Sequence, residues 1–99
     1  IIRVDVMSKE LVKLNDFGLL TFGTTTQALK AEKVLQRAGA EFLVIPVPRE
    51  VSASCGLAVK TRMENLPGQR ELLQQELVRV EAAYHIRPKD KGREVILIE

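Results

Sequence analysis

The segment Pro46–Gly56 divides this chain into two halves that repeat one pattern. Pro46 and Pro48 lack a backbone N–H, so they end the apolar run before them and interrupt any sheet ladder. The residues on each side of the segment read as strand, helix and strand. The segment also holds Cys55, the only cysteine among 99 residues. It therefore sets the order of the elements and marks the first place to look for chemistry.

The first half predicts a helix between two buried strands. Phe17–Phe22 and Phe42–Ile45 are short apolar runs of strand length. Between them, Thr24 with Gln27 fits a capping box, and Gly39 is typical of a helix C-terminus. Helical spacing predicts one apolar stripe, which comprises Ala28, Ala31, Leu35 and Ala38, with Leu29 and Val34 beside them.

The second half repeats this order. Leu57–Val59 predicts a strand that extends toward Arg62, and Pro67 stands at a tolerated early position of a helix. Val80–Ile86 predicts the next strand, which we expect to end before Pro88. For the helix, we expect Leu72, Leu73 and Leu77 on the inner face, and Gln69, Arg70, Gln74, Gln75 and Glu76 on the outer face.

This order predicts an α+β fold, a ferredoxin-like split β-α-β sandwich with extra N- and C-terminal strands. Both helices would cover one face of the sheet, and the first and third strands would be central and antiparallel. We expect residues 1–99 to form a single domain with its core at residues 17–88.

Two terminal extensions, residues 1–15 and 89–99, lie outside that core. Ile1–Val6 alternates apolar and charged residues, and Glu94–Ile98 follows a turn at Lys89–Gly92, so both predict strands. Their exposed edges predict pairing with each other or with a second copy of the chain, as in a homodimer. Ser8–Leu14 fits either a helical turn or a loop. The sequence begins with Ile1, and Met7 is a candidate natural start.

Composition argues against several classes of partner. Fifteen basic and thirteen acidic residues give a net charge of +2, without a basic block, and aromatic residues make up 4% of the chain. We therefore expect no nucleic-acid partner. No apolar run approaches the roughly 20 residues that span a bilayer, and no signal-peptide pattern is present, so we expect no membrane partner. A single cysteine favours a reducing, cytoplasmic location.

The remaining residues mark no second chemical site. His85 is the only histidine, and one histidine with one cysteine does not make a zinc site from protein ligands alone. No catalytic carboxylate pair stands out, and a resolving cysteine is absent from the sequence. We expect no metal and no cofactor, and the sequence does not indicate a stand-alone enzyme.

The predicted topology gives Cys55 a definite position. The first strand ends where the first helix begins, and the Pro46–Gly56 loop would lie at that same end of the sheet. Cys55 should therefore lie near the helix start at Thr24 or Thr25, where free N–H groups favour a thiolate. Small neighbours leave room around the sulfur, and nearby polar groups supply charge or hydrogen bonds; the candidate supporting residues are Arg49, Ser52, Ser54, Gly56, Thr24 and Thr25.

Cys55 has two interpretations on these grounds. A lone cysteine in an intracellular domain is commonly a small buried hydrophobic residue. A cysteine flanked by serine, alanine and glycine in a proline-bounded loop is also typical of a reactive thiol. The residues alone leave both open.

The sequence resembles the selenium/sulfur carrier-protein-like family of small bacterial and archaeal domains. The resemblance covers about Phe17 to Pro88, and its residues are Thr21-Phe22, Ala28–Lys33, Ile45–Ser52 and Ser54–Val59. It implies that Cys55 is the carrier thiol, which holds sulfur or selenium and passes it between donor and acceptor proteins. The terminal extensions fall outside it.

Two other functions remain open. The first is a non-enzymatic small-molecule-binding or regulatory module that uses the Gly23–Thr26 helix start. The second is a structural assembly domain in which Ile1–Val6 and Glu94–Ile98 build a dimer, and it is compatible with either of the others.

Overall fold

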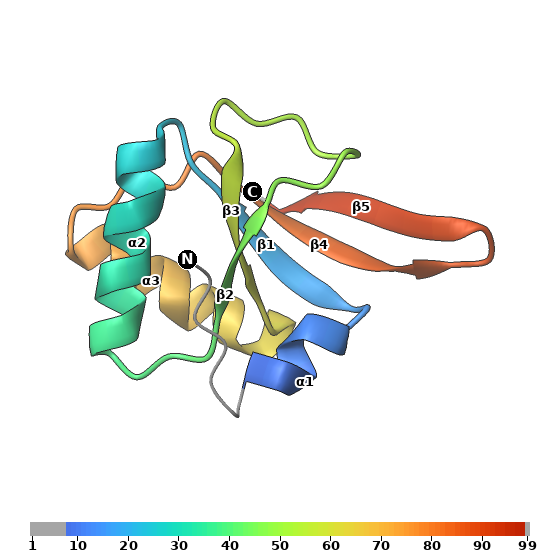
Figure 1. The fold of residues 1–99 in the computed structure, drawn as a ribbon, viewed down its shortest axis with the longest axis horizontal. Coiled ribbons are helices and arrows are strands. Elements are labelled where there is room, and N and C mark those ends of the chain that lie inside the picture. Colours follow the sequence, from blue (N-terminus) through green and yellow to red (C-terminus); the bar gives the residue numbers. More distant parts are fainter. Residues whose placement is uncertain (1–7, 99) are drawn as a thin grey trace.

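A computed structural model describes residues 8–98, which form a five-stranded antiparallel sheet with helices packed against it (Figure 1). The sheet order is β2-β3-β1-β4-β5, so the fold is α+β, as predicted. The elements are α1 (Ser8–Lys13), β1 (Phe17–Thr21), α2 (Thr25–Arg37), β2 (Leu43–Pro46), β3 (Leu57–Thr61), the 3₁₀ turn η1 (Met63–Asn65), α3 (Leu66–Gln75), β4 (Ala82–Lys89) and β5 (Gly92–Ile98).

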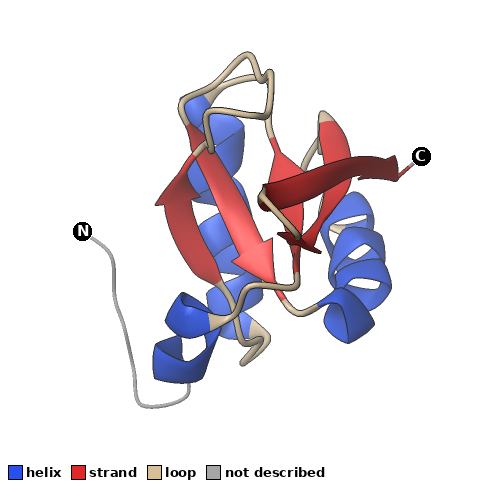
Figure 2. Cartoon of the chain, turned by 90° about the vertical axis from the view of Figure 1, so that its right-hand side faces the viewer, coloured by secondary structure: helices blue, strands red, loops and turns tan. Residues whose placement is uncertain are grey.

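The central strands are those expected from the sequence. β1 and β3 are adjacent and antiparallel, with Leu20 opposite Val59. β4 pairs with the other edge of β1, and β2 with the other edge of β3. Because both β1 and β2 run antiparallel to β3, they point the same way, and the loop between β2 and β3 lies at the end of the sheet where β1 finishes. Figures 1 and 2 show this loop at the opposite end of the molecule from α1.

The two faces of the sheet bury separate apolar clusters. On one face, Leu20, Val59 and Ala83 pack against α2 and α3, so both long helices cover the same side, as predicted. The other face carries a smaller cluster that includes Leu19 and Ala58. Val51 of the β2–β3 loop also belongs to this second cluster. The loop therefore covers part of the face that the long helices leave open.

The limits of α2 follow from its ends. The Oγ1 atom of Thr24 accepts a hydrogen bond from the N–H of Gln27 at 3.2 Å, which caps the first turn. Gly39 adopts a φ of +70° just after the helix, a conformation that glycine takes without steric cost. The predicted stripe was too wide, because Leu29 is exposed, about 100° round the helix from Ala28, and Ala38 is an exposed C-cap.

The expected faces of α3 need two corrections. Leu77 is 82% exposed rather than buried, because α3 ends at Gln75 and Leu77 turns the chain with a φ of 62°. The next residue, Val78, donates its N–H to the carbonyl of Leu73 at 2.8 Å, which is the Schellman pattern of helix termination. Gln69 was expected on the outer face but is buried, since its Nε2 donates to the carbonyl of Glu41 at 3.1 Å.

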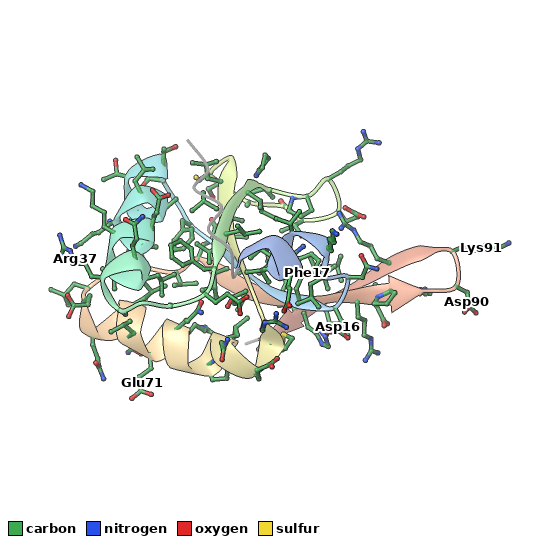
Figure 3. The ribbon with its side chains drawn as sticks, turned by 60° about the horizontal axis from the view of Figure 1, so that its bottom comes forward. Asp16, Phe17, Arg37, Glu71, Asp90 and Lys91 are labelled. Carbon is green, nitrogen blue, oxygen red and sulfur yellow. The ribbon has the colours of Figure 1, made fainter. Side chains whose placement is uncertain are left out.

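The C-terminal part of the sheet also differs from expectation. β4 continues through Pro88 to Lys89, and β5 begins at Gly92 and pairs with β4. Beyond Ile86, β4 has no β1 neighbour, so a proline there costs no bond to β1. Asp90 and Lys91 form the turn of this hairpin, which projects away from the helices (Figures 1 and 3). The predicted strand Ile1–Val6 lies outside the described residues.

The N-terminal ambiguity resolves as a helix, because residues Ser8–Lys13 form α1. None of the helices within residues 8–98 has the length and apolar character needed to cross a membrane.

Candidate functional site

Cys55 lies in the loop between β2 and β3, close to the pair Pro46–Leu57 at which the two strands meet the loop. At the base of this loop, the N–H of Val47 donates to the carbonyl of Gly56 at 3.0 Å. A turn at its far side is closed by the N–H of Val51, which donates to the carbonyl of Pro48 at 3.0 Å. Val51 is buried, so the loop is anchored by an apolar side chain as well as by backbone bonds.

The sulfur of Cys55 lies near two hydrogen-bond donors, one at the start of β3 and one at the start of α2. The N–H of Leu57 lies 3.3 Å from Sγ, and the hydroxyl of Thr25 lies 3.8 Å from it. The predicted location near the helix start is therefore confirmed. When the sulfur is a thiolate, both groups donate to it; when it is a thiol, its proton is directed toward the carbonyl of Leu57, 3.7 Å from Sγ.

Cys55 is nevertheless buried. Only 7% of the residue is exposed, and it belongs to the cluster beneath α2 and α3 that includes Phe22 and Val59. Cys55 thus packs as a small buried residue, and its sulfur lies next to two polar groups, the N–H of Leu57 and the hydroxyl of Thr25.

Glu81 is a residue that sequence reasoning missed. Its carboxylate accepts two hydrogen bonds from Ser54, one from the N–H at 3.2 Å and one from the hydroxyl. These bonds hold the pKa of the Glu81 carboxyl below its ordinary value, the hydroxyl bond being the larger cause. The N–H of Glu81 also donates to the carbonyl of Thr21 at 2.7 Å, so one residue joins the end of β1 to the cysteine loop.

The signal for Glu81 was present in the predicted topology. In an antiparallel pair, the strand after the second helix must begin where β1 ends, which is also the end that carries Cys55. A carboxylate at the first residues of that strand was therefore a candidate neighbour of the loop.

The other candidate supporting residues divide into three groups of two. Thr25 lies beside the sulfur, and Ser54 precedes Cys55 and is held by Glu81. The side-chain oxygen of Thr24 accepts the hydrogen bond that caps α2, and the carbonyl of Gly56 accepts the hydrogen bond at the base of the loop. The remaining two, Arg49 and Ser52, are exposed on the loop, and the charge of Arg49 acts on Glu50, whose pKa it helps to lower.

His85 takes no part in this site. It stands opposite Gly18 near the other end of β1, and its Nε2 lies 2.7 Å from Oδ1 of Asp16. His85 therefore lies at the end of β1 away from Cys55, in contact with Asp16.

The family model described as "Putative Se/S carrier protein-like" matches residues 17–85. The chain belongs to this family. The match includes β1, α2, the β2–β3 loop, α3 and the start of β4, so Cys55, Thr25 and Leu57 all lie within it. Comparison with curated proteins gave no match, and comparison with solved structures gave none either.

Proposed function

We propose that this protein carries sulfur or selenium on Cys55 between donor and acceptor proteins. The observation that carries the proposal is the position of its only cysteine, with Sγ 3.3 Å from the N–H of Leu57 and 3.8 Å from the hydroxyl of Thr25 at the start of α2. Donors and a helix start stabilise an anionic sulfur or selenium. Family membership supports the same function through the name of the family.

The transfer is an exchange reaction. The Cys55 thiolate attacks the outer chalcogen atom of a donor persulfide or selenosulfide, and a bond forms between Sγ and that atom. The bond to the donor sulfur breaks, and the donor leaves as a thiolate. Delivery repeats the step with an acceptor nucleophile in place of Cys55. No net oxidation occurs in either step, so neither requires a resident cofactor, and a single cysteine avoids discharge by an internal disulfide.

Loading requires access to a buried atom. The β2–β3 loop is held on one side by the bonds between Ser54 and Glu81 and on the other by the ion pair between Glu50 and Arg93. All four side chains are substantially exposed, and exposed polar contacts are weak enough to open on encounter with a partner. In this proposal, Arg49 and Ser52 contact the partner proteins from the exposed loop.

The proposal extends to the whole chain. The order β2-β3-β1-β4, with both long helices on one face, supports a ferredoxin-like core, which we propose as a single domain. The outer edge of β5 pairs with no strand among residues 8–98, and this supports a homodimer formed through that edge. We place the protein in the cytoplasm on the basis of its single cysteine.

The binding-module alternative at Gly23–Thr26 has less support. The side-chain oxygen of Thr24 is engaged by the N–H of Gln27, and the side chain of Gln27 accepts from the N–H of Arg79 at 2.9 Å. The side-chain groups of Thr24 and Gln27 at this helix start are thus already engaged in hydrogen bonds within the chain.

The test is loading by a natural type of donor. The full chain is incubated with a cysteine desulfurase and cysteine, or with a selenocysteine lyase and selenocysteine, and its intact mass is recorded. We expect a gain of one sulfur or selenium atom, absent from Cys55→Ser. Failure to gain either atom, under conditions that load a known carrier, would contradict the proposal.

A further inference from the structure

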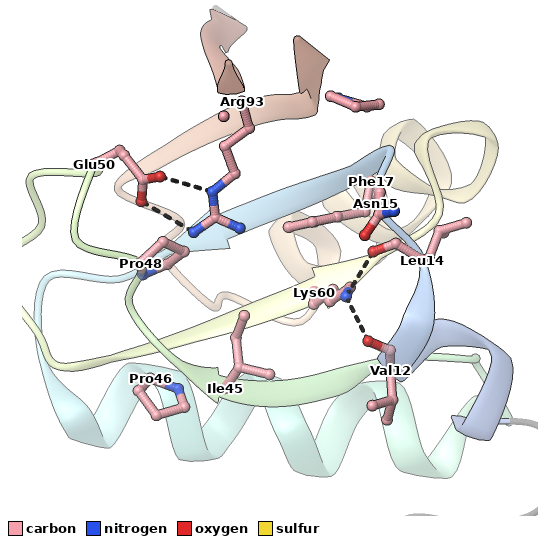
Figure 4. Close-up of a pocket in the computed structure, with 12 residues that line it drawn as sticks. Val12, Leu14, Asn15, Phe17, Ile45, Pro46, Pro48, Glu50, Lys60 and Arg93 are labelled. Carbon is pink, nitrogen blue, oxygen red and sulfur yellow. Dashed lines mark hydrogen bonds and ion pairs between the residues drawn. The ribbon is translucent and has the colours of Figure 1, made fainter. Parts of the chain in front are cut away.

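A pocket of about 820 Å³ lies on the face of the sheet that α2 and α3 leave open. It extends between the end of α1, the β2–β3 loop and the part of the β4–β5 hairpin next to its turn (Figure 4). Its volume falls within the range of small-molecule sites. Much of its wall is apolar, with contributions from Leu14, Phe17, Ile45, Pro46 and Pro48.

One of the two cations of this pocket, Lys60, is buried. Lys60 is 7% exposed, and its ammonium donates to the carbonyls of Leu14 at 2.9 Å and Val12 at 3.3 Å. It also lies 4.2 Å from the centroid of the Phe17 ring. An ammonium has three N–H groups, and no carboxylate of residues 8–98 forms an ion pair with it. A positive charge therefore lies at the pocket without a carboxylate of residues 8–98 bound directly to it.

The second cation is Arg93, which already forms an ion pair with a carboxylate. Its Nε and Nη2 donate to the two oxygens of Glu50 at 2.8 and 3.0 Å (Figure 4). Burial lowers the pKa of Lys60, and the charge of Arg93 lowers it further, so the two cations act on each other. Among residues 8–98, two positively charged side chains and one negatively charged side chain line the pocket, so their net charge is positive.

We propose that this pocket binds a small carboxylic acid with an apolar chain, in its ionised form. The ligand's carboxylate takes the place of Glu50 on Arg93, within the field of Lys60, and its chain covers Phe17 and Ile45. This site does not depend on Cys55, and the proposal goes beyond the carrier function.

The bidentate bond between Glu50 and Arg93 is the reason for choosing a carboxylate. It demonstrates that the guanidinium presents a two-pronged donor toward the pocket, the geometry that a carboxylate fits. Arg93 and Glu50 side chains are 38% and 42% exposed, so solvent screens their ion pair and hydrates Glu50 when the pair opens. Glu50 is thus an internal competitor that the ligand displaces.

Hexanoate is a suitable probe, because it combines a carboxylate with a short apolar chain. The full ¹⁵N-labelled chain is titrated with hexanoate, 1-hexanol and inorganic phosphate, and amide shifts are followed by NMR. We expect saturable shifts with hexanoate at Lys60, Arg93 and the β2–β3 loop, retained in Cys55→Ser. 1-Hexanol and phosphate should bind more weakly, because each supplies only part of the required chemistry.

Two variants of the same ion pair separate binding from mere structural damage. Glu50→Gln removes the competitor and should tighten hexanoate binding by about two- to fivefold. Arg93→Gln removes the guanidinium that donates to the ligand's carboxylate and should weaken hexanoate binding by about tenfold or more. Both variants break the same bridge, so a purely structural effect would move the affinity in the same direction.

Several results would overturn the proposal. These are the absence of saturable hexanoate binding, equal effects of the two variants, and binding of 1-hexanol or phosphate as tight as that of hexanoate. Contacts in the free protein between residues 1–7 and the pocket, detected as NMR cross-peaks, would identify the chain's own N-terminal segment as the occupant and would also refute it.

Discussion

Glu81 restrains the cysteine loop through Ser54, one residue before Cys55. Sγ itself is held by Leu57 and Thr25, so the loop and the sulfur have separate contacts. Loss of the Glu81 carboxylate should therefore release the loop without removing the groups that stabilise an anionic sulfur.

Glu81→Ala should speed the modification of Cys55 by iodoacetamide in the native protein by about two- to fivefold, because the loop opens more often. The rate is measured by intact mass against time. Glu71→Ala, on the exposed surface of α3 (Figure 3), is the matched control and should leave the rate unchanged. An unchanged rate in Glu81→Ala would mean that Glu81 does not limit access.

At the scale of elements, the sequence predicted the place of Cys55 but not its burial. Strand order and chain direction follow from hydrophobic patterns and proline positions. Together they were enough to predict that Cys55 lies near Thr25. Burial depends on side chains from distant elements, here the cluster under α2 and α3. The role of Leu77 was missed for a related reason, since apolar spacing continues past the point where backbone geometry ends α3.

Leu77 provides a test of that helix end. Leu77→Gly should raise the free energy of unfolding by about 0.5–1 kcal/mol, because glycine relieves the left-handed strain at the cost of some chain entropy. Leu77→Ala should bring no such gain, because alanine keeps the strain. The measurement is urea unfolding followed by circular dichroism. A loss of stability in Leu77→Gly would show that the leucine side chain contributes contacts in solution.

Gly18 tests the packing of β1 against α3. A Cβ at this position would lie 2.4 Å from Cδ1 of Leu66 and 3.2 Å from the sulfur of Met63. Gly18→Ala should therefore cost about 1–3 kcal/mol of stability through overpacking. Gly68→Ala, inside α3 with no atom within 4 Å of the added Cβ, should instead stabilise by about 0.5–1 kcal/mol. Equal denaturation midpoints for Gly18→Ala and Gly68→Ala would contradict this packing.

At the scale of the whole molecule, the pair Glu50–Arg93 joins the β2–β3 loop to the β4–β5 hairpin. The hydrogen bond from Arg93 lowers the pKa of Glu50 to about 2, from an ordinary value of 4.5. A carboxyl with a lower pKa in the folded state stabilises the fold while it is ionised. This contribution is complete above pH 4.5 and is lost as the pH falls toward 2.

The wild type should consequently have a higher free energy of unfolding than Glu50→Gln at neutral pH. The two values should become equal near pH 2. Urea midpoints measured at a series of pH values test this. A difference that persists unchanged at the acid end would assign the effect of the substitution to something other than the charge of Glu50.

The carrier function predicts reversible loading. Protein loaded by a cysteine desulfurase is separated from the enzyme and treated with excess dithiol, which returns Cys55 to the free thiol and releases the outer sulfur as hydrogen sulfide while the dithiol is oxidised. The decisive measurement is the amount of sulfide released per chain. We predict one equivalent from the wild type and none from Cys55→Ser. The absence of sulfide from the wild type, or an equal yield from Cys55→Ser, would contradict the assignment of Cys55 as the carrier residue.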